Sequence, residues 1–298
     1  MLFFMKERFW QETRQTGWLL TLFLGAAFVG LPSQGLCLPS KAVKSFRSKM
    51  VKVKGGLYLP MFAGKVRKRV RVKTFWVDET AVTHREFLAF VRANSRWRRS
   101  RVSRLFAGPS YLRHWSNDLS LGSKASSLVN SPVTYVSWFP ARYYCKWKGK
   151  RLPTTHEWEY MAMASKTRRQ GQKEKGYLQR ILAWYSKPTS HILPSVKSTY
   201  RNVWGVYDTH GLIWEWTLDF NNATLTGDAR SDKALSRKLF CGAGSQGASN
   251  VNDYASFMRF AFRSSLKFHF TIANLGFRCA SSLPPKARRK KTSLGKKE

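Results

Sequence analysis

Hydrophobic and basic residues alternate along the segment from Arg69 to Lys73. Val70 and Val72 stand on one side of the alternation, and an arginine or lysine stands at each position beside them. A period of two residues places the apolar side chains on one face of an extended chain and the charged ones on the other. The pattern therefore predicts a strand with one buried face and one solvated face.

Three helix starts are marked by residues that cap helices. Thr83-x-x-Glu86 and Thr154-x-x-Glu157 both place threonine three residues before glutamate, and apolar residues follow at helical spacing. This arrangement is typical of a capping box, in which the two side chains bond exposed N–H groups of the first turn. Ser137 is expected to cap another helix, which runs through Cys145 and ends at Gly149.

The other segments show little periodicity. Residues 165–180 are polar and charged, which predicts an exposed excursion, and residues 188–202 are rich in proline, serine and threonine, which predicts a loop. After Asn202 the chain has many glycines, aromatic residues and short apolar runs, which favours short strands and tight loops over long amphipathic helices. The sequence thus predicts an α+β domain with little regular secondary structure.

The N-terminus has the composition of an export signal. Basic residues precede an apolar run at 17–31, and small residues at 33–35 offer a cleavage site. The run is shorter than the roughly 20 residues that span a bilayer as a helix. We expect a cleaved signal peptide over residues 1–37 and a periplasmic or envelope-associated location; a retained anchor or a buried core helix are the alternatives.

Composition adds one unusual property, a formal net charge of +37 from 53 Lys and Arg against 16 Asp and Glu. A charge of this size predicts salt-dependent attraction to anionic surfaces. Basic residues occur in every segment, including an expected linker at 38–54 and an expected disordered tail at 283–298. An apolar fraction of 43% is sufficient for a substantial core, which excludes a chain disordered throughout.

Four ordered blocks occur in the central and C-terminal parts of the chain. They are Gly-Lys-Arg-Leu-Pro-Thr at 149–154, Asn-Val-Trp-Gly-Val-Tyr-Asp at 202–208, Trp-Glu-Trp-Thr at 214–217 and Asn-Leu-Gly-Phe-Arg-Cys-Ala at 274–280. Together they resemble the formylglycine-generating enzyme family, also called the sulfatase-modifying factor family. The resemblance covers about three quarters of the chain. It implies one domain over residues 55–282 with that family's irregular α+β fold, a distant variant of the C-type lectin fold.

Oxidising members of that family carry a reactive cysteine pair, five residues apart, shortly before the last block. Counted back from Cys279 without gaps, these positions hold Ala255 and about Asn250. Neither residue supplies the thiolate that attacks sulfur and binds copper. The resemblance therefore implies the fold without formylglycine formation. The chain is similar to a branch that lacks the pair and resembles accessory proteins of nitrite reductase and of pyoverdine maturation.

Beyond Cys37 the chain has three cysteines. In relatives with these blocks, the cysteine before the first block bridges to the one that closes the last. The resemblance thus implies a disulfide between Cys145 and Cys279, worth roughly 4–5 kcal/mol in the loop-entropy model, with buried free thiols as the alternative. Cys241 is left over. It is a candidate catalytic thiol or copper ligand, because neighbouring glycines and positive charge favour an accessible thiolate; it could equally be a small buried hydrophobic residue.

Glu215 is a candidate calcium ligand. In calcium-binding relatives the Trp-Glu-Trp block contributes this glutamate, together with an asparagine whose position here holds Leu212. Loss of one oxygen ligand weakens a site that needs six to eight, so a buried glutamate bonded to backbone or to arginine is the alternative.

Arg259 and Arg263 lie among aromatic residues in the stretch that builds the substrate groove of relatives. Arginine there could bind a carboxylate or phosphate through paired hydrogen bonds, and Tyr254 nearby is a candidate catalytic residue. The alternative is that both arginines are buried against a carboxylate such as Asp219 or Glu215.

Three functions can be compared at this stage. The first is an exported accessory or maturation factor for a periplasmic client protein or small molecule; if it is an enzyme, we expect an oxygen-dependent oxidoreductase. The second, a working formylglycine-generating enzyme, is disfavoured by Ala255. The third is a non-catalytic module that binds an anionic envelope polymer, a membrane surface or nucleic acid, and nucleic acid is the partner we expect least.

Overall fold

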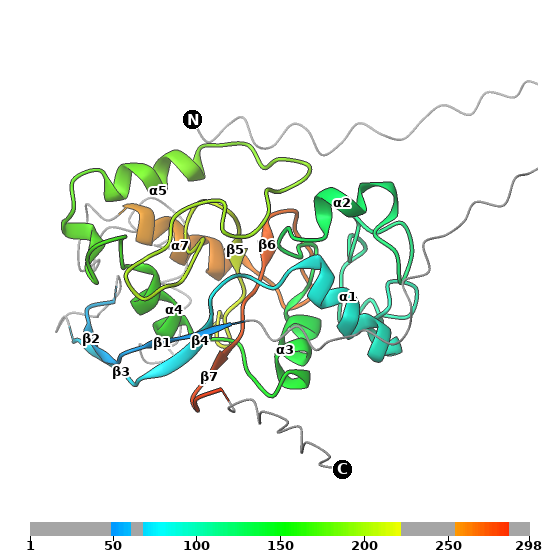
Figure 1. Cartoon of the computed structure of the whole chain (residues 1–298), viewed down its shortest axis with the longest axis horizontal. Coiled ribbons are helices and arrows are strands. Elements are labelled where there is room, and N and C mark those ends of the chain that lie inside the picture. The colour runs from blue at the N-terminus through cyan, green and yellow to red at the C-terminus, as the bar shows by residue number, and fades with distance from the viewer. Residues whose placement is uncertain (1–48, 61–67, 222–253, 286–298) are drawn as a thin grey trace, which may run out of the picture. The chain divides into compact units, whose positions relative to one another are not determined.

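The chain folds into helices and short strands joined by much irregular backbone (Figure 1). The computed structural model describes residues 49–60, 68–221 and 254–285. Its strands are β1 Met50–Val53, β2 Gly56–Tyr58, β3 Val70–Val72, β4 Phe75–Asp78, β5 Trp214–Glu215, β6 Leu275–Gly276 and β7 Ala280–Ser281. β1, β4 and β7 form an antiparallel sheet in that order, β2 pairs with β3 antiparallel, and β5 pairs with β6 in parallel. The predicted α+β class with little regular structure is confirmed.

The strand predicted around Val70 is β3, in which Arg71 is exposed and Val72 is buried. Strand β1 was not expected. Residues 50–53, predicted as the end of a basic linker, form β1, and Val53 is fully buried at the end that pairs with Phe75. The basic composition of the segment hid this pairing, because only alternate side chains of an edge strand need to be apolar.

Six α-helices lie within the described ranges, besides three short 3-10 helices at Ser95–Trp97, Gly122–Lys124 and Gly171–Lys173. The α-helices are α1 His84–Ala93, α2 Ala125–Leu128, α3 Trp138–Trp147, α4 Thr155–Ala162, α5 Tyr177–Tyr185 and α7 Tyr254–Ser265. Both predicted capping boxes are present: the N–H groups of Thr83 and Thr154 each donate to the glutamate three residues on, at 2.9 Å. Ser137 precedes α3 as predicted, but its hydroxyl donates to the Phe106 carbonyl instead of capping the helix.

Two helices contradict the sequence prediction. α5 begins inside the segment expected to be an exposed excursion, and it buries Tyr177 and Ile181. α7 falls where only short strands and loops were expected. Its buried face includes Arg259 and Arg263, so it has no continuous apolar stripe for a periodicity analysis to find.

An aromatic cluster joins α1, α3 and the last block of the chain. The Tyr144 ring lies 5.8 Å from the Phe87 ring and 5.4 Å from the Phe277 ring, measured between centroids. The disulfide between Cys145 and Cys279 lies in the same cluster and connects residues 134 apart in sequence. The bridge implied by the resemblance is therefore present, and it fixes β7 to the core.

A second apolar cluster lies between the sheets and α4. Val53 and Phe75 from the three-stranded sheet pack in one cluster with Trp158 and Met161 of α4. This packing places the α4 side chains next to the buried ion pairs described below. Within the described ranges, no helix combines the length and the apolar character needed to cross a bilayer.

Candidate functional site

The first turn of α7 contains Ala255, the residue that the ungapped count from Cys279 assigns to one reactive cysteine of the resembled family. Ala255 is fully buried and packs in one cluster with Tyr177 and Ile181 of α5. The Tyr185 hydroxyl, also from α5, donates to the Ala255 carbonyl at 3.4 Å. This position therefore presents only a methyl group, covered by α5, and offers neither a nucleophile nor a metal ligand.

Glu159 joins α4 to α7 through two arginines. Arg259 donates from Nε to both carboxylate oxygens, at 3.1 and 3.2 Å, and from Nη2 at 2.8 Å, and Arg263 bonds the same carboxylate. Burial alone would raise the pKa of the Glu159 carboxyl, but the two guanidinium groups outweigh it and lower that pKa to about 2. The cluster carries two positive charges and one negative charge.

Both arginines are nearly buried, with side chains 6% and 7% exposed. Nη2 of Arg259 also donates to the Ser256 hydroxyl at 2.6 Å, and the Arg263 guanidinium lies 4.6 Å from the centroid of the Trp158 ring. The carboxylate that both arginines contact is Glu159, and not Asp219 or Glu215, which the sequence alternative named. Their first role is thus to hold α7 on α4, and their predicted substrate-binding role stays a prediction.

Tyr58 and His156 form a polar pair near Glu159 that sequence reasoning missed. The Tyr58 hydroxyl lies 2.6 Å from Nδ1 of His156. Burial and the nearby Glu159 carboxylate raise the pKa of Tyr58 well above its usual range, so the phenol stays neutral. Residues 58 and 156 have no recognisable motif spacing, so the sequence carried no signal for the pair.

Glu215 and Arg278 form an ion pair in which both side chains are fully buried. Arg278 donates to the two carboxylate oxygens at 2.7–3.0 Å, and the Trp158 indole donates to Glu215 at 2.8 Å. Calcium does not fit this arrangement, because a permanent cation already occupies the carboxylate and Leu212 supplies no oxygen from its side chain. The alternative that the sequence left open, a buried glutamate bonded to arginine, describes the contact.

The other predicted site residues are not part of the Glu159 or Glu215 clusters. Tyr254 is 53% exposed at the start of α7, and its ring lies 6.0 Å from that of Phe257. Cys241 and Asn250 lie outside the described residues, so the predicted role of the Cys241 thiol stays a prediction. Among the residues that the structure describes, no group of three or more His, Cys, Asp or Glu side chains is arranged to hold a metal ion.

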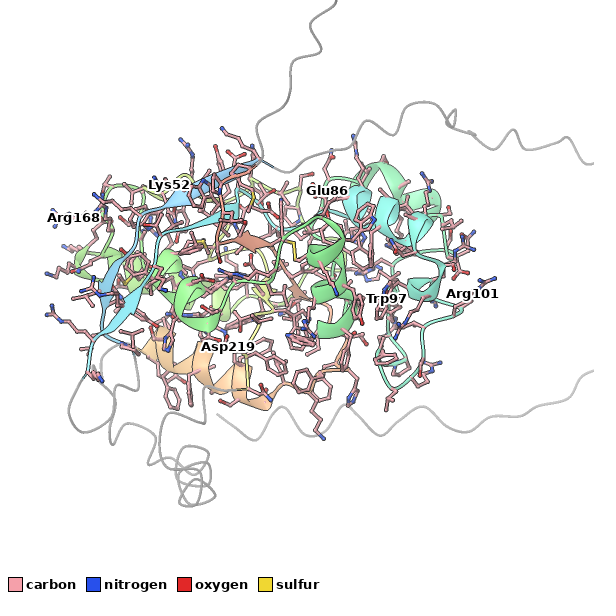
Figure 2. All side chains as sticks on the ribbon, turned by 90° about the horizontal axis from the view of Figure 1, so that it is seen from below. Lys52, Glu86, Trp97, Arg101, Arg168 and Asp219 are labelled. Atoms are coloured by element: carbon pink, nitrogen blue, oxygen red, sulfur yellow. A yellow bond between two sulfur atoms is a disulfide. The ribbon has the colours of Figure 1, made fainter. Side chains whose placement is uncertain are left out.

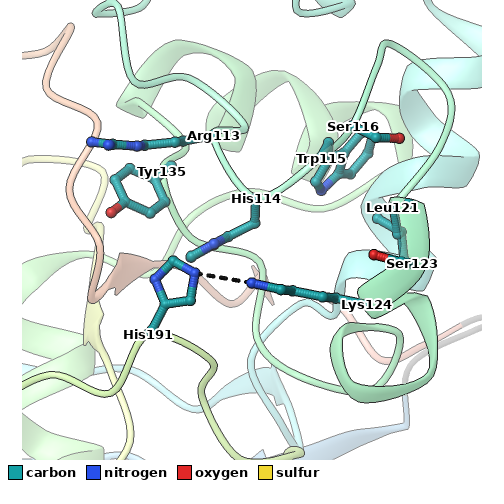
Figure 3. A pocket seen from close by; sticks show the side chains of 10 residues that line it. Arg113, His114, Trp115, Ser116, Leu121, Ser123, Lys124, Tyr135 and His191 are labelled. Atoms are coloured by element: carbon teal, nitrogen blue, oxygen red, sulfur yellow. Dashed lines mark hydrogen bonds between the residues drawn. The ribbon is translucent and has the colours of Figure 1, made fainter.

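A separate pocket of about 450 Å³ lies between the loop after residue 112 and His191 (Figure 3). Its lining includes Arg113, His114, Lys124 and Tyr135. Burial, followed by the nearby His191, Lys124 and Arg113, lowers the pKa of His114 below its ordinary value, which favours the neutral imidazole. Residues 114 and 191 have no metal-ligand spacing in the sequence, and their rings, 5.4 Å apart between centroids, meet only in the fold.

Comparison with known proteins gives one family match. The profile of the family described as the sulfatase-modifying factor enzyme 1-like domain matches residues 38–283. The formylglycine-generating enzyme of Streptomyces coelicolor is 29% identical over 249 residues, covering 71% of this chain and 79% of that protein. The inactive C-alpha-formylglycine-generating enzyme 2 of Bos taurus is 29% identical over 258 residues, covering 73% and 80%.

The chain also resembles solved structures. CarF has a TM-score of 0.45 and 17% sequence identity, covering 80% of this chain and 99% of that chain. PvdO from Pseudomonas aeruginosa has a TM-score of 0.44 and 17% identity, covering 78% and 94%.

Proposed function

Because the chain belongs to the sulfatase-modifying factor enzyme 1-like domain family, we propose that it is an exported accessory or maturation factor that binds a client and does not generate formylglycine. One observation carries the proposal: Ala255, which the ungapped count from Cys279 assigns to a reactive-cysteine position, has no thiol and is fully buried. The two cysteines within the described ranges are joined to each other, so neither is free to act as a nucleophile or copper ligand.

The client-binding surface in this proposal includes the exposed end of α7. Tyr254 is more than half exposed there, and Phe257 packs beside it. Large, partly exposed aromatic residues are typical of protein-binding surfaces, because they bury much area at little cost in side-chain entropy. Arg259 and Arg263, on the same helix, give this surface guanidinium groups, which suit a client segment with a carboxylate or phosphate.

Two measurements test the two halves of the proposal. The purified protein is first incubated with copper(I), oxygen and a cysteine-containing sulfatase peptide. Mass spectrometry should find the peptide thiol unchanged, both for the native chain and for Cys241→Ser. Conversion of the peptide thiol to an aldehyde would overturn the proposal directly.

The second measurement places a photo-crosslinking residue at position 254 in the exporting cell. The same residue at position 105 is the control, because Leu105 is 76% exposed and lies outside α7. We expect one abundant crosslinked partner from position 254, retained at high salt, and none from position 105. Equal crosslinking from both positions would contradict a client site at α7.

A second function, binding to an anionic envelope polymer or membrane surface, is favoured by the placement of carboxylates. Every acidic residue within the described ranges is buried or partly buried: Asp78, Glu79, Glu86, Asp118, Glu157, Glu159, Glu174, Asp208, Glu215 and Asp219. Exposed cations face different directions, as Arg101 and Arg168 do in Figure 2. A polyanion binder should lose affinity for anionic vesicles steeply as salt rises and be indifferent to substitution at Tyr254.

A further inference from the structure

The pocket beside His114 gathers positive charge around a cavity of small-molecule size. Figure 3 shows Lys124 extending toward His191, with His114 between Lys124 and the Tyr135 ring. A volume of about 450 Å³ falls within the range of pockets that hold small ligands. This pocket has no part in the proposed client contact at α7.

Two cations at the pocket have no counter-ion within the described chain. Arg113 takes part in no ion pair among the described residues, and Lys124 has His191 Nε2 as its only hydrogen-bond partner there, at 3.4 Å. None of the lining residues is acidic. Elsewhere in the described chain, partly buried cations such as Lys150 and Arg151 contact carboxylates. The lining of the pocket thus carries two positive charges that no carboxylate among the described residues neutralises.

The wall of the pocket is built rigidly. Tyr135 packs edge-on against His114, with ring centroids 4.8 Å apart, and the Trp115 indole donates to Nδ1 of His84 at 2.9 Å. Because Nδ1 of His84 accepts this bond, its proton is on Nε2, and that buried N–H has no hydrogen-bond partner among the described residues. The bond fixes the Trp115 indole behind the pocket wall.

The backbone on which the wall stands is strained. Leu112 and Tyr135 have φ values of 49° and 54°, and the Leu112 N–H donates to the Tyr135 carbonyl at 3.0 Å. Neither residue is glycine, so each left-handed conformation has a cost that the surrounding packing must offset. Strain of this kind concentrates at sites that hold side chains in position for a ligand.

We propose that this pocket binds a small molecule carrying a phosphate group, with a ring or apolar part against Tyr135. Arg113 and Lys124 together match the charge of a phosphate monoester near neutral pH. His114 and His191 add ring N–H groups that can donate to phosphate oxygens. A divalent metal ion is disfavoured as occupant, because both cations repel it.

The test is calorimetric titration of the full chain with phenyl phosphate, with inorganic phosphate and with zinc ions, at a fixed moderate salt concentration. The chain's net charge of +37 gives every anion some nonspecific attraction, so a charge-matched control is needed. Arg113→Gln/Lys124→Gln removes two exposed charges at the pocket, and Arg101→Gln/Arg168→Gln removes two exposed charges away from it. Unchanged melting temperatures show that both double variants are folded.

We expect saturable binding of phenyl phosphate that is tighter than that of inorganic phosphate. The pocket variant should weaken it at least tenfold, and the distant variant should change it less than twofold. Equal weakening in both variants, no saturable binding, or zinc binding that phenyl phosphate does not displace would each overturn the proposal. None of these outcomes depends on whether α7 binds a client.

Discussion

Two clusters of this protein pair a glutamate with arginines that are at most 7% exposed, yet they differ in the number of arginines. Glu215 faces one arginine, Arg278, and both side chains are fully buried. Glu159 is 19% exposed and is shared by Arg259 and Arg263. The first cluster is a neutral pair, whereas in the second one carboxylate meets two guanidinium groups.

The surroundings of each cluster follow from that difference. The N–H groups of Arg278 that do not bond Glu215 donate to main-chain carbonyls, at 3.2 Å to Asp78 and 2.9 Å to Tyr207. That cluster therefore joins β4 to the last block of the chain and leaves no charge for a ligand. The Glu159 cluster stands where α4 meets α7, the helix that begins with the exposed Tyr254. The same pairing chemistry thus anchors the last block of the chain in one place and α7 in the other.

The largest effect is expected at the neutral cluster. Glu215→Gln leaves the Arg278 guanidinium buried without a counter-charge, which costs about 3–5 kcal/mol of the free energy of unfolding. Denaturant unfolding followed by tryptophan fluorescence measures the loss. If Glu215→Gln lost less free energy of unfolding than Glu159→Gln, the more deeply buried ion pair would not be the more stabilising one, which would contradict this comparison.

A smaller and pH-dependent effect is expected at the cluster of Glu159, Arg259 and Arg263. The pKa of Glu159 is lowered to about 2 in the folded protein, against about 4.5 for an ordinary glutamate, so the ion pairs contribute stability above pH 4.5 and lose it as pH falls toward 2. Glu159→Gln should therefore cost about 3 kcal/mol at neutral pH.

Unfolding of the native chain and of this variant at a series of pH values measures the effect. The two free energies should converge as the pH approaches 2. A difference that stays constant over this range would mean that Glu159 does not titrate as its arginine contacts require.

The smallest effect concerns the helix that carries Glu159. Thr154→Ala removes the cap of α4 and should cost about 1 kcal/mol, and Thr83→Ala should cost a similar amount at α1. Only the first change loosens the support of Glu159, so the pKa of Glu159, followed by NMR, should rise in Thr154→Ala alone. An equal rise in both variants would show that the pKa of Glu159 does not depend on the cap of α4.

Parts of this architecture could be predicted because their interactions are local. Each capping box joins residues three apart, and the alternation in β3 is complete within five residues. The disulfide between Cys145 and Cys279 is long-range, but the blocks around both cysteines implied it through the family resemblance. The structure also explains why the last block has glycine at position 276, since a Cβ there would meet the Val133 carbonyl oxygen at 2.5 Å.

The candidate sites could not be derived in this way. α7 escaped prediction because its buried face contains arginines, and a buried arginine is stable only beside a carboxylate that the fold brings to it. The carboxylate is Glu159, 100 residues away from Arg259 in sequence. His114 and His191 likewise meet only because two loops close around one cavity.

The sequence by itself determined the local hydrogen bonds and the family, and it predicts through Ala255 that the reactive thiol is absent. The tertiary structure alone decided which carboxylate neutralises which arginine and where cations are left without one. The reason is physical: a hydrogen bond within a helical turn depends on neighbours in the chain, whereas the balance of buried charge depends on segments that only folding brings together.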